Sequence, residues 1–382
     1  MSLNKVYIKK TGNFFPNEPV SNDEMEAYLG LIDGKPSKAK KIVLRNNGIK
    51  RRFYALSKKG KATHTNAQMT ALAIRKIFED DPEGLKNIDL LSCGTSSPDQ
   101  MMPSHGVMVH GWLPETGAIE VVSPSGVCCA SMHAFKYAYM AVKTGDAHYA
   151  VSTGSERFSA SLRSDVFEDE VKNLEALKEN PYISFEKDFL RWMLSDGAAA
   201  FLLSDTKNEH SLNLCVEWIE GISYAQEKDT CMYMACEKEK DGTLKSYLDY
   251  SPAEIMNKSI LSIKQDTRLL SENIVPLGTS KLKSIFNNKE LNINEIDYFL
   301  PHISSEFFRN KIAENLKEIG MHVPAEKWFI NLADIGNVGA GSIYLMVDEL
   351  FRSGRLKMGE KILLLVPESS RFSYMFALLT VC

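Results

Sequence analysis

The stretch that decides the fold is IEVVSPSGVCCASMHAFKYAYMAVKTGDAHYAVSTGSE, which runs from Ile119 to Glu156. An apolar run at 119–122 leads into Ser-Pro-Ser-Gly, and two adjacent cysteines then open a helix that stops at 144–145. A second apolar run follows at 148–153. The pattern predicts a strand, a sharp turn, a helix and a second strand, as in an α/β protein with parallel strands.

Cys128 and Cys129 stand where the turn meets the helix. There the first-turn N–H groups and the helix dipole favour a thiolate, which makes a cysteine reactive without a metal. Cysteine is also among the most commonly buried residue types, and it packs as a small hydrophobe. A nucleophile and a core residue are both open interpretations at this point, and the helix start alone does not choose between the two cysteines.

The composition is that of a globular protein. The chain has 382 residues, of which 44% are hydrophobic and 25% are charged, so it can bury one large or two medium cores. Its formal net charge of −4 argues against nucleic acid as a main partner. The N-terminal segment lacks the apolar core of a signal peptide, and no run approaches the roughly 20 residues that span a membrane. We therefore expect no membrane span and a cytoplasmic protein.

The cysteines predict neither a disulfide framework nor a metal site. There are seven, at irregular spacings, and the only close pair is adjacent in sequence. Adjacent cysteines cannot chelate as a C-x-x-C pair does, and His105 and His110 are five residues apart, off one helix face. We expect no metal.

A basic run, KPSKAKKIVLRNNGIKRR, lies at 35–52 and holds eight basic residues and no acidic one. Charge runs of this kind are usually solvated surface. The alternative is a docking surface for something anionic, such as a phosphate-bearing cofactor or an acidic protein. Both interpretations carry similar weight.

The second half of the chain repeats the first. EIDYFLPHISS at 295–305 echoes NIDLLSCGTSS at 87–97, and each closes an apolar strand with a loop that ends in Ser-Ser. The segment 351–372 echoes 139–158, each with a helix end, a Gly turn and a buried strand. The offset is roughly 210 residues in both comparisons, which indicates a duplicated strand-helix unit.

Two halves related by a pseudo-twofold would bring their equivalent loops together, because parallel α/β sheets bind ligands at the C-terminal ends of strands. The predicted N-terminal half, 1–206, carries Cys128, and the C-terminal half, 207–382, carries His302 and Asn337. A thiolate can take an acyl group. Imidazole and amide donors can stabilise the negative charge that develops on a thioester carbonyl or an enolate.

These motifs resemble those of the β-ketoacyl-acyl carrier protein synthase III family of thiolase-fold condensing enzymes. The similarity covers almost the whole chain and includes GIKRRFYA, the cysteine turn, SDGAAAFLLSD, IDYFLPHISS and NLADIGNVGAGS. It implies an α/β thiolase fold with five αβαβα layers, two pseudo-twofold-related halves and a homodimer. The family's nucleophile, His and Asn correspond to Cys128, His302 and Asn337, and the spacing to Lys143 selects Cys128 over Cys129.

Two departures from the family pattern bear on the chemistry. The chain has His-Ile-Ser-Ser at 302–305 where the family usually has His-Gln-Ala-Asn, and Glu-Ser-Ser-Arg at 368–371 where the family has Phe-Gly-Gly-Gly. Glu368 is either a structural carboxylate paired with Arg371 or another cation, or a general base that removes an α-proton. The second interpretation suits a non-decarboxylating condensation, as in the branch that makes dialkylresorcinol-type lipids.

The resemblance also implies substrates and surfaces. Family members use acyl thioesters of coenzyme A or acyl carrier protein, without a permanently bound cofactor. Basic residues at the tunnel mouth receive the carrier and its pantetheine phosphate, and Arg45, Arg51 and Lys317 are the candidates here. A loop similar to SSPDQMMPSH reaches the partner's acyl pocket in the family, so Met101 and Met102 are predicted to contact the alkyl chain across the dimer. Ordinary core methionine is an equally open interpretation.

The sequence thus predicts a condensing acyltransferase, a ketosynthase that loads a fatty acyl group on Cys128. A carbon–carbon bond then forms with a second acyl, β-ketoacyl or malonyl thioester. One alternative is a catalytically silent acyl-binding partner subunit, against which the survival of all three site residues argues. Another is a hydroxymethylglutaryl-synthase-like or thiolase-like enzyme, in which Cys129 or Glu368 would supply the second reactive group.

Overall fold

A large mixed sheet dominates the structure. The computed structural model describes residues 3–37, 39–167 and 190–382. Within these residues the sheet has nine strands, in the order β13-β14-β15-β8-β1-β7-β6-β4-β5. Its strands are β1 (Tyr7–Phe14), β4 (Leu90–Gly94), β5 (Glu120–Val122), β6 (Tyr149–Glu156), β7 (Gly197–Ser204), β8 (Leu214–Ser223), β13 (Tyr298–Pro301), β14 (Lys361–Glu368) and β15 (Ser373–Val381).

The sheet consists of two halves that share one strand pattern. In the N-terminal half β1 is antiparallel to β7, β7 is antiparallel to β6, and β6 is parallel to β4. In the C-terminal half β8, β15, β14 and β13 repeat these directions in the same order. The halves join where Tyr7 and Ile8 of β1 pair with β8. The predicted pseudo-twofold relation is confirmed, because the echoing segments form β4 and β13, and β6 and β14.

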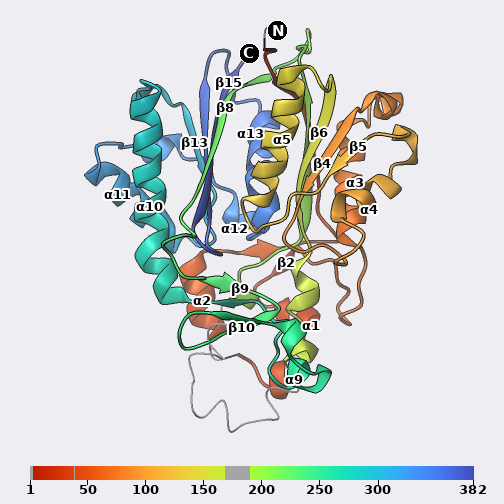
Figure 1. The fold of residues 1–382 in the computed structure, drawn as a ribbon, viewed down its shortest axis with the longest axis vertical. Coiled ribbons are helices and arrows are strands. Elements are labelled where there is room, and N and C mark those ends of the chain that lie inside the picture. The colour runs from red at the N-terminus through yellow and green to blue at the C-terminus, as the bar shows by residue number, and fades with distance from the viewer. Residues whose placement is uncertain (1–2, 38, 168–189) are drawn as a thin grey trace.

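Helices form three layers that alternate with the two halves of the sheet (Figure 1). α5 and α13 lie between the halves, α3 and α4 cover the outer face of the N-terminal half, and α10 and α11 cover the outer face of the C-terminal half. These helices are α3 (Asn66–Ile77), α4 (His105–Gly111), α5 (Ala130–Thr144), α10 (Thr267–Asn288), α11 (Phe307–Glu318) and α13 (Ser342–Arg352). The result is the predicted order of five layers, αβαβα.

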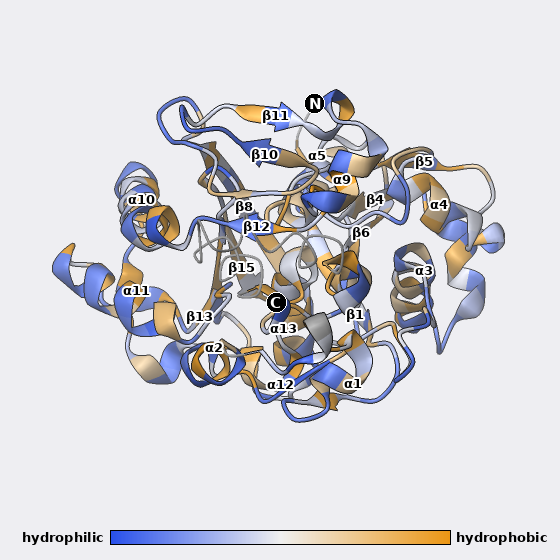
Figure 2. Ribbon diagram, turned by 90° about the horizontal axis from the view of Figure 1, so that it is seen from below, coloured by the Kyte–Doolittle hydropathy of each residue, from blue (hydrophilic) through white to orange (hydrophobic). Residues whose placement is uncertain are grey.

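The helices of the two outer layers are amphipathic. In Figure 2 both hydrophilic and hydrophobic colours occur along α3, α4, α10 and α11, as expected of helices that bury one face against a sheet.

The smaller elements are α1 (Met25–Leu29), α2 (Lys40–Asn47), α9 (Pro252–Asn257), α12 (Leu332–Ile335), β2 (Val20–Ser21), β3 (Arg51–Arg52), β9 (Met232–Tyr233), β10 (Cys236–Lys238), β11 (Leu244–Ser246) and β12 (Lys264–Gln265). Many of them gather below the sheet in Figure 1, at the end of the molecule opposite the two chain termini.

The connection from β7 to β8 spans residues 205–213. The boundary expected between residues 206 and 207 falls in this connection. The strand pattern on each side of it is compatible with two halves, and the division at that point stays a prediction.

The central layer is tied to the sheet by one buried tyrosine. Tyr344 of α13 stacks on Phe201 of β7, with ring centroids 3.9 Å apart and an interplanar angle of 7°. Its hydroxyl donates to the Ser131 carbonyl of α5 at 3.0 Å and forms a hydrogen bond with the Ser152 hydroxyl of β6 at 2.6 Å. The side chain therefore links both central helices to the N-terminal half of the sheet.

We expect two substitutions of Tyr344 to differ in cost. Tyr344→Phe removes only the hydroxyl and leaves buried partners unsatisfied, so the free energy of unfolding should fall by about 1–3 kcal/mol. Tyr344→Ala also opens a cavity in the central layer, and the loss should be about 3–5 kcal/mol. Urea unfolding of both variants at pH 7 measures the difference, and equal losses would contradict the packing role of the ring.

Candidate active site

The cysteine turn joins β5 to α5. A parallel bridge between Thr95 and Ser125 extends the pairing of β4 and β5 up to the turn. α5 begins at Ala130, and Cys129 is its N-cap residue. The predicted helix start at the cysteine pair is therefore confirmed within the usual uncertainty of helix ends.

The two adjacent cysteines have different surroundings. Cys129 is buried in the core between the sheet halves, and its thiol donates to the Val366 carbonyl at 3.4 Å. Cys128 lines a cavity of about 640 Å³. The structure thus offers Cys128 to a substrate and uses Cys129 for packing.

His302 lines the same cavity as Cys128. It directly follows β13, and its N–H donates to the Leu365 carbonyl of β14 at 2.8 Å, which prolongs the parallel ladder by one residue. The side chain is buried, and burial lowers the pKa of the imidazole to about 4. The imidazole is therefore neutral at pH 7 and can accept a proton.

Asn337 also lines this cavity, from the loop between α12 and α13. Its N–H donates to the Met193 carbonyl at 3.0 Å, and its carbonyl accepts from the Ser195 N–H at 2.9 Å. The side-chain Oδ1 accepts from the Gly339 N–H at 2.9 Å. With Oδ1 engaged, the side-chain NH₂ is the group that can donate to a ligand.

The remaining cavity wall is mainly apolar. The cavity reaches between α10 and α11 and under β9 and β12, where typical lining residues are Met232, Ile263, Ile274, Val275, Phe308 and Ile312. Among the described residues, Asp99 and Arg157 are the only acidic and basic side chains that line it. A wall of this kind suits an alkyl chain with one polar end.

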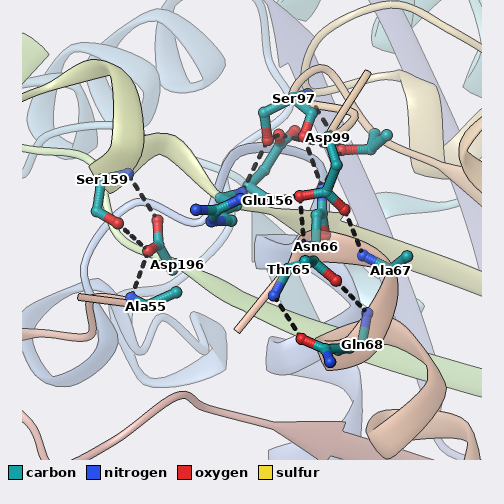
Figure 3. Close-up of polar contacts among 12 residues, drawn as sticks. Ala55, Thr65, Asn66, Ala67, Gln68, Ser97, Asp99, Glu156, Ser159 and Asp196 are labelled. Atoms are coloured by element: carbon teal, nitrogen blue, oxygen red, sulfur yellow. Dashed lines mark hydrogen bonds and ion pairs between the residues drawn. The ribbon is translucent and has the colours of Figure 1, made fainter. Parts of the chain in front are cut away.

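Asp99 and Arg157 neutralise one another in the cavity wall. The guanidinium donates from Nη1 to Asp99 Oδ1 at 2.9 Å, and both side chains are largely buried. Asp99 also accepts hydrogen bonds from the N–H groups of Asn66 and Ala67, at 2.9 and 3.0 Å, at the start of α3 (Figure 3). The pair therefore anchors the loop after β4 to the N-terminus of α3.

A fully buried carboxylate, Glu156, ends β6 beside the site. It accepts hydrogen bonds from the Ser96 N–H at 3.1 Å, the Ser97 hydroxyl at 2.5 Å and the Ala340 N–H at 3.2 Å (Figure 3 shows the Ser97 contact). Burial outweighs these donors and raises the pKa of Glu156 to about 7. Because Ala340 belongs to the loop of Asn337, one side chain holds two loops of the site together.

The sequence analysis missed Glu156 and Asp196. Asp196 accepts from the Ala55 N–H at 2.6 Å and from the Ser159 N–H at 2.9 Å (Figure 3), and burial raises its pKa to about 6. Each acid stands at one end of an otherwise apolar strand, in TGSE and SDGAAA. A carboxylate in that setting is costly unless backbone donors satisfy it, and this was the available signal.

The surroundings of Cys128 keep its thiol protonated. Burial raises the pKa of the thiol well above its ordinary value, and the carboxylates of Glu368 and Glu156 raise it further. The cysteine's own backbone N–H acts in the opposite direction and more weakly. The expectation that this helix start favours a thiolate is therefore wrong, since burial and two carboxylates raise the pKa of the thiol more than the backbone N–H lowers it.

Glu368 bonds the cysteine turn rather than a cation. Its Oε2 accepts hydrogen bonds from the N–H groups of Val127 and Cys129, both at 2.9 Å. Arg371 Nε donates instead to the Lys228 carbonyl at 2.9 Å. The expected pairing of Glu368 with Arg371 is wrong, because backbone donors of the turn satisfy the carboxylate.

Met101 and Met102 lie at an exposed loop tip and keep 76% and 86% of their surface accessible. Met101 lines the cavity of its own chain, and its sulfur accepts a hydrogen bond from the Tyr247 hydroxyl at 3.2 Å. Their exposure excludes ordinary core packing in the single chain. A contact across a dimer stays a prediction.

The three predicted docking cations lie on the surface on separate elements. Arg45 is on α2, Arg51 forms an exposed ion pair with Asp334 at 2.5 Å, and Lys317 is in the last turn of α11. The start of α11 contacts the end of α2 through one backbone hydrogen bond. Since an α-helix rises about 1.5 Å per residue, Lys317 lies roughly 15 Å along α11 from that contact. A shared docking role stays a prediction.

Two features are absent from the described ranges 3–37, 39–167 and 190–382. Within them, no three His, Cys, Asp or Glu side chains are grouped so that they could hold a metal ion. In the same part of the chain, no helix combines the length and the apolar character needed to cross a membrane.

The five layers are those of the thiolase fold, and solved structures agree with this fold. A variant of Xanthomonas campestris OleA with bound lauric acid and lauroyl-CoA matches with a TM-score of 0.74 at 18% identity, over 98% of this chain and 99% of that chain. The 3-oxoacyl-[acyl-carrier-protein] synthase III of Aquifex aeolicus matches with a TM-score of 0.69 at 18% identity, over 98% and 99% of the two chains.

Sequence comparisons indicate one family of relatives. The model of the 3-oxoacyl-[acyl-carrier-protein] synthase III C-terminal region matches residues 286–366, which include His302 and Asn337. The β-ketoacyl-[acyl-carrier-protein] synthase III of Clostridium acetobutylicum is 24% identical over 94% of each chain. The chain is thus similar to β-ketoacyl-[acyl-carrier-protein] synthase III over almost its whole length, and these relatives indicate a condensing acyltransferase.

We expect Glu156 to make stability depend on pH. Its folded-state pKa of about 7 lies above the ordinary value of 4.5, so its contribution is fully present below pH 4.5 and is lost as pH rises through 7. Glu156→Gln, which does not titrate, should therefore lose less stability than the unsubstituted protein between pH 5 and pH 8. The difference should be on the order of 2–3 kcal/mol.

Urea unfolding of both proteins at pH 5 and pH 8 measures this difference. The pKa of Asp196 is also raised, but this residue is present in both proteins, so its contribution cancels in the comparison. Identical pH dependences in the two proteins would show that the donors around Glu156 keep it ionised.

Proposed function

We propose that Cys128 takes a fatty acyl group from a thioester and that the acyl group is then joined to a second acyl, β-ketoacyl or malonyl thioester. A dialkylresorcinol-type lipid is the proposed product class. The observation that carries this proposal is that Cys128, His302 and Asn337 line one cavity whose remaining wall is mainly apolar. The thiol supplies a nucleophile, the wall receives an alkyl chain, and the other two side chains can stabilise an oxyanion.

In the proposed acylation step, the Cys128 sulfur attacks the thioester carbonyl. A carbon–sulfur bond to Cys128 forms, and the bond to the sulfur of the carrier breaks. His302 is neutral, so its imidazole can accept the thiol proton as the new bond forms and return it to the departing thiolate. The raised pKa of the thiol and the lowered pKa of the imidazole oppose this transfer before the bond begins to form. The acyl chain then lies against the apolar wall between α10 and α11.

In the proposed condensation step, a carbanion from the second thioester attacks the acyl carbonyl on Cys128. The carbon–carbon bond forms, the carbon–sulfur bond to Cys128 breaks, and the sulfur leaves as a thiolate that takes up a proton. A malonyl thioester forms this carbanion by losing carbon dioxide. An acyl or β-ketoacyl thioester must instead lose an α-proton to a base. Asn337 and His302 would stabilise the enolate oxygen in either case.

Substrate carriers belong to the same proposal. Thioesters of coenzyme A or acyl carrier protein are the proposed substrates, and the chemistry calls for no resident cofactor. The lauroyl-CoA bound by the OleA variant supports a fatty acyl thioester as donor. A homodimer, in which the exposed tip at Met101 and Met102 contacts the partner's pocket, is also part of the proposal.

A catalytically silent acyl-binding subunit is the second candidate. The raised pKa of the Cys128 thiol favours it, because a protonated thiol is a poor nucleophile. A hydroxymethylglutaryl-synthase-like or thiolase-like enzyme has less support. Cys129, which would have to supply a second reactive thiol, lies in the core.

We expect an acyl adduct on Cys128. Intact-protein mass spectrometry after incubation with acyl and β-ketoacyl thioesters should show a mass increase equal to the acyl group. The adduct should disappear in Cys128→Ala and persist in Cys129→Ala, because only Cys128 lines the cavity. No adduct with any donor would support the silent subunit.

We expect the cavity between α10 and α11 to set the chain length. Val275 lines it, and Val275→Phe should shorten the longest acyl group that forms an adduct by roughly two to four carbons, since the added ring fills the space of several methylenes. Ser280→Val, on the exposed face of the same helix, is the matched control. An unchanged chain-length profile in Val275→Phe would place the alkyl chain elsewhere.

A further inference from the structure

Both carboxylate oxygens of Glu368 are fixed by hydrogen bonds. Glu368 is the last residue of β14 and is 7% exposed. Oε2 accepts from the N–H groups of Val127 and Cys129, each at 2.9 Å, and Oε1 accepts from the Ser370 hydroxyl at 2.7 Å. Two of these donors flank Cys128 in sequence, so the carboxylate holds the backbone of the turn on both sides of this cysteine by hydrogen bonds.

The carboxylate reaches this turn from outside the substrate cavity. Pro367 and Ser369 line the cavity, whereas Glu368 between them does not. Neighbouring residues of an extended strand point to opposite faces, which explains the alternation. A general base must come within hydrogen-bond reach of the proton that it removes. Glu368 instead accepts hydrogen bonds from the backbone of the cysteine turn, which is the role of a positioning residue and not of a general base.

The N–H groups at a helix start are also the groups that lower a cysteine pKa. Here Glu368 occupies two of them, on either side of Cys128, and places a negative charge close to the sulfur. The other titratable or charged groups around the thiol include Glu156 at the end of β6, Cys129 in the turn, His302 after β13, Tyr374 of β15, and the Asp99–Arg157 pair in the cavity wall. His133 of α5 is close enough to Glu368 for the carboxylate to affect its pKa, which burial lowers. Burial makes His302 neutral, and Asp99 and Arg157 balance one another.

We propose that Glu368 is a positioning residue that fixes the cysteine turn and keeps Cys128 a neutral thiol until a thioester occupies the cavity. The resting nucleophile is then insensitive to small electrophiles. This inference rests on the proposed function only in taking Cys128 as the nucleophile. It concerns the free protein and needs no thioester to be tested.

The test is the pH dependence of Cys128 alkylation by iodoacetamide in the full-length protein, followed by peptide mass spectrometry. In the unsubstituted protein the midpoint of the rate profile should lie above pH 9. Glu368→Gln keeps an acceptor for the two N–H groups but removes the charge. Its midpoint should fall by about one unit or more, which is a rate gain of roughly tenfold at pH 8. Glu227→Gln, which removes an exposed acid, is the matched control and should follow the unsubstituted profile.

Three results would overturn the proposal. A midpoint below pH 8 in the unsubstituted protein would do so without any variant, even if Glu368→Gln failed to fold. An unchanged midpoint in folded Glu368→Gln would also do so. If that variant still formed the acyl adduct but lost turnover, Glu368 would be a general base instead. Absence of every acyl adduct would count against the proposed function and would leave the alkylation result standing.

Discussion

The burial of α5 and α13 between two halves of one sheet is the constraint on which the site depends. Each helix must satisfy apolar contacts on two sides, and Tyr344 shows how α13 is tied both to α5 and to the strands beside it. The cysteine turn joins the end of β5 to α5, and the loop of Asn337 joins α12 to α13, so each central helix begins at a loop of the site. Cys128 and Asn337 reach one cavity by this route, and His302 reaches it from the end of β13.

Much of this arrangement follows from local pattern. The apolar runs predicted the buried strands, and the repeat at an offset of roughly 210 residues predicted that β4 and β13 are equivalent. Once strand ends are known to converge, the polar residues after them become site candidates. His302, Asn337 and the cysteine pair were reached in this way, and the family resemblance then selected Cys128. The structure brings Cys128, His302 and Asn337 to a common cavity.

What the sequence could not predict depends on contacts between distant segments. Glu368 and Cys129 are separated by 239 residues, and nothing in either segment reveals that a carboxylate oxygen meets the turn. The protonation of Cys128 is a balance among burial, two carboxylates and a helix start, and each of these is set by tertiary packing. The contacts of Glu156 are equally distant in sequence. It ends β6, but its donors include Ser96 in the loop after β4 and Ala340 in the loop before α13.

The protonation states of Cys128 and His302 bear on the timing of the proposed acylation. Burial disfavours the imidazolium of His302 as well as the thiolate of Cys128, so proton transfer between them costs free energy in an empty cavity. In the proposed acylation a bound thioester changes this balance, because the negative charge passes to its carbonyl oxygen as the sulfur bonds to the carbonyl carbon. Asn337 and His302 can then stabilise the oxyanion. Charge separation and bond formation are therefore coupled, and a buried carboxylate beside the turn is compatible with a reactive cysteine.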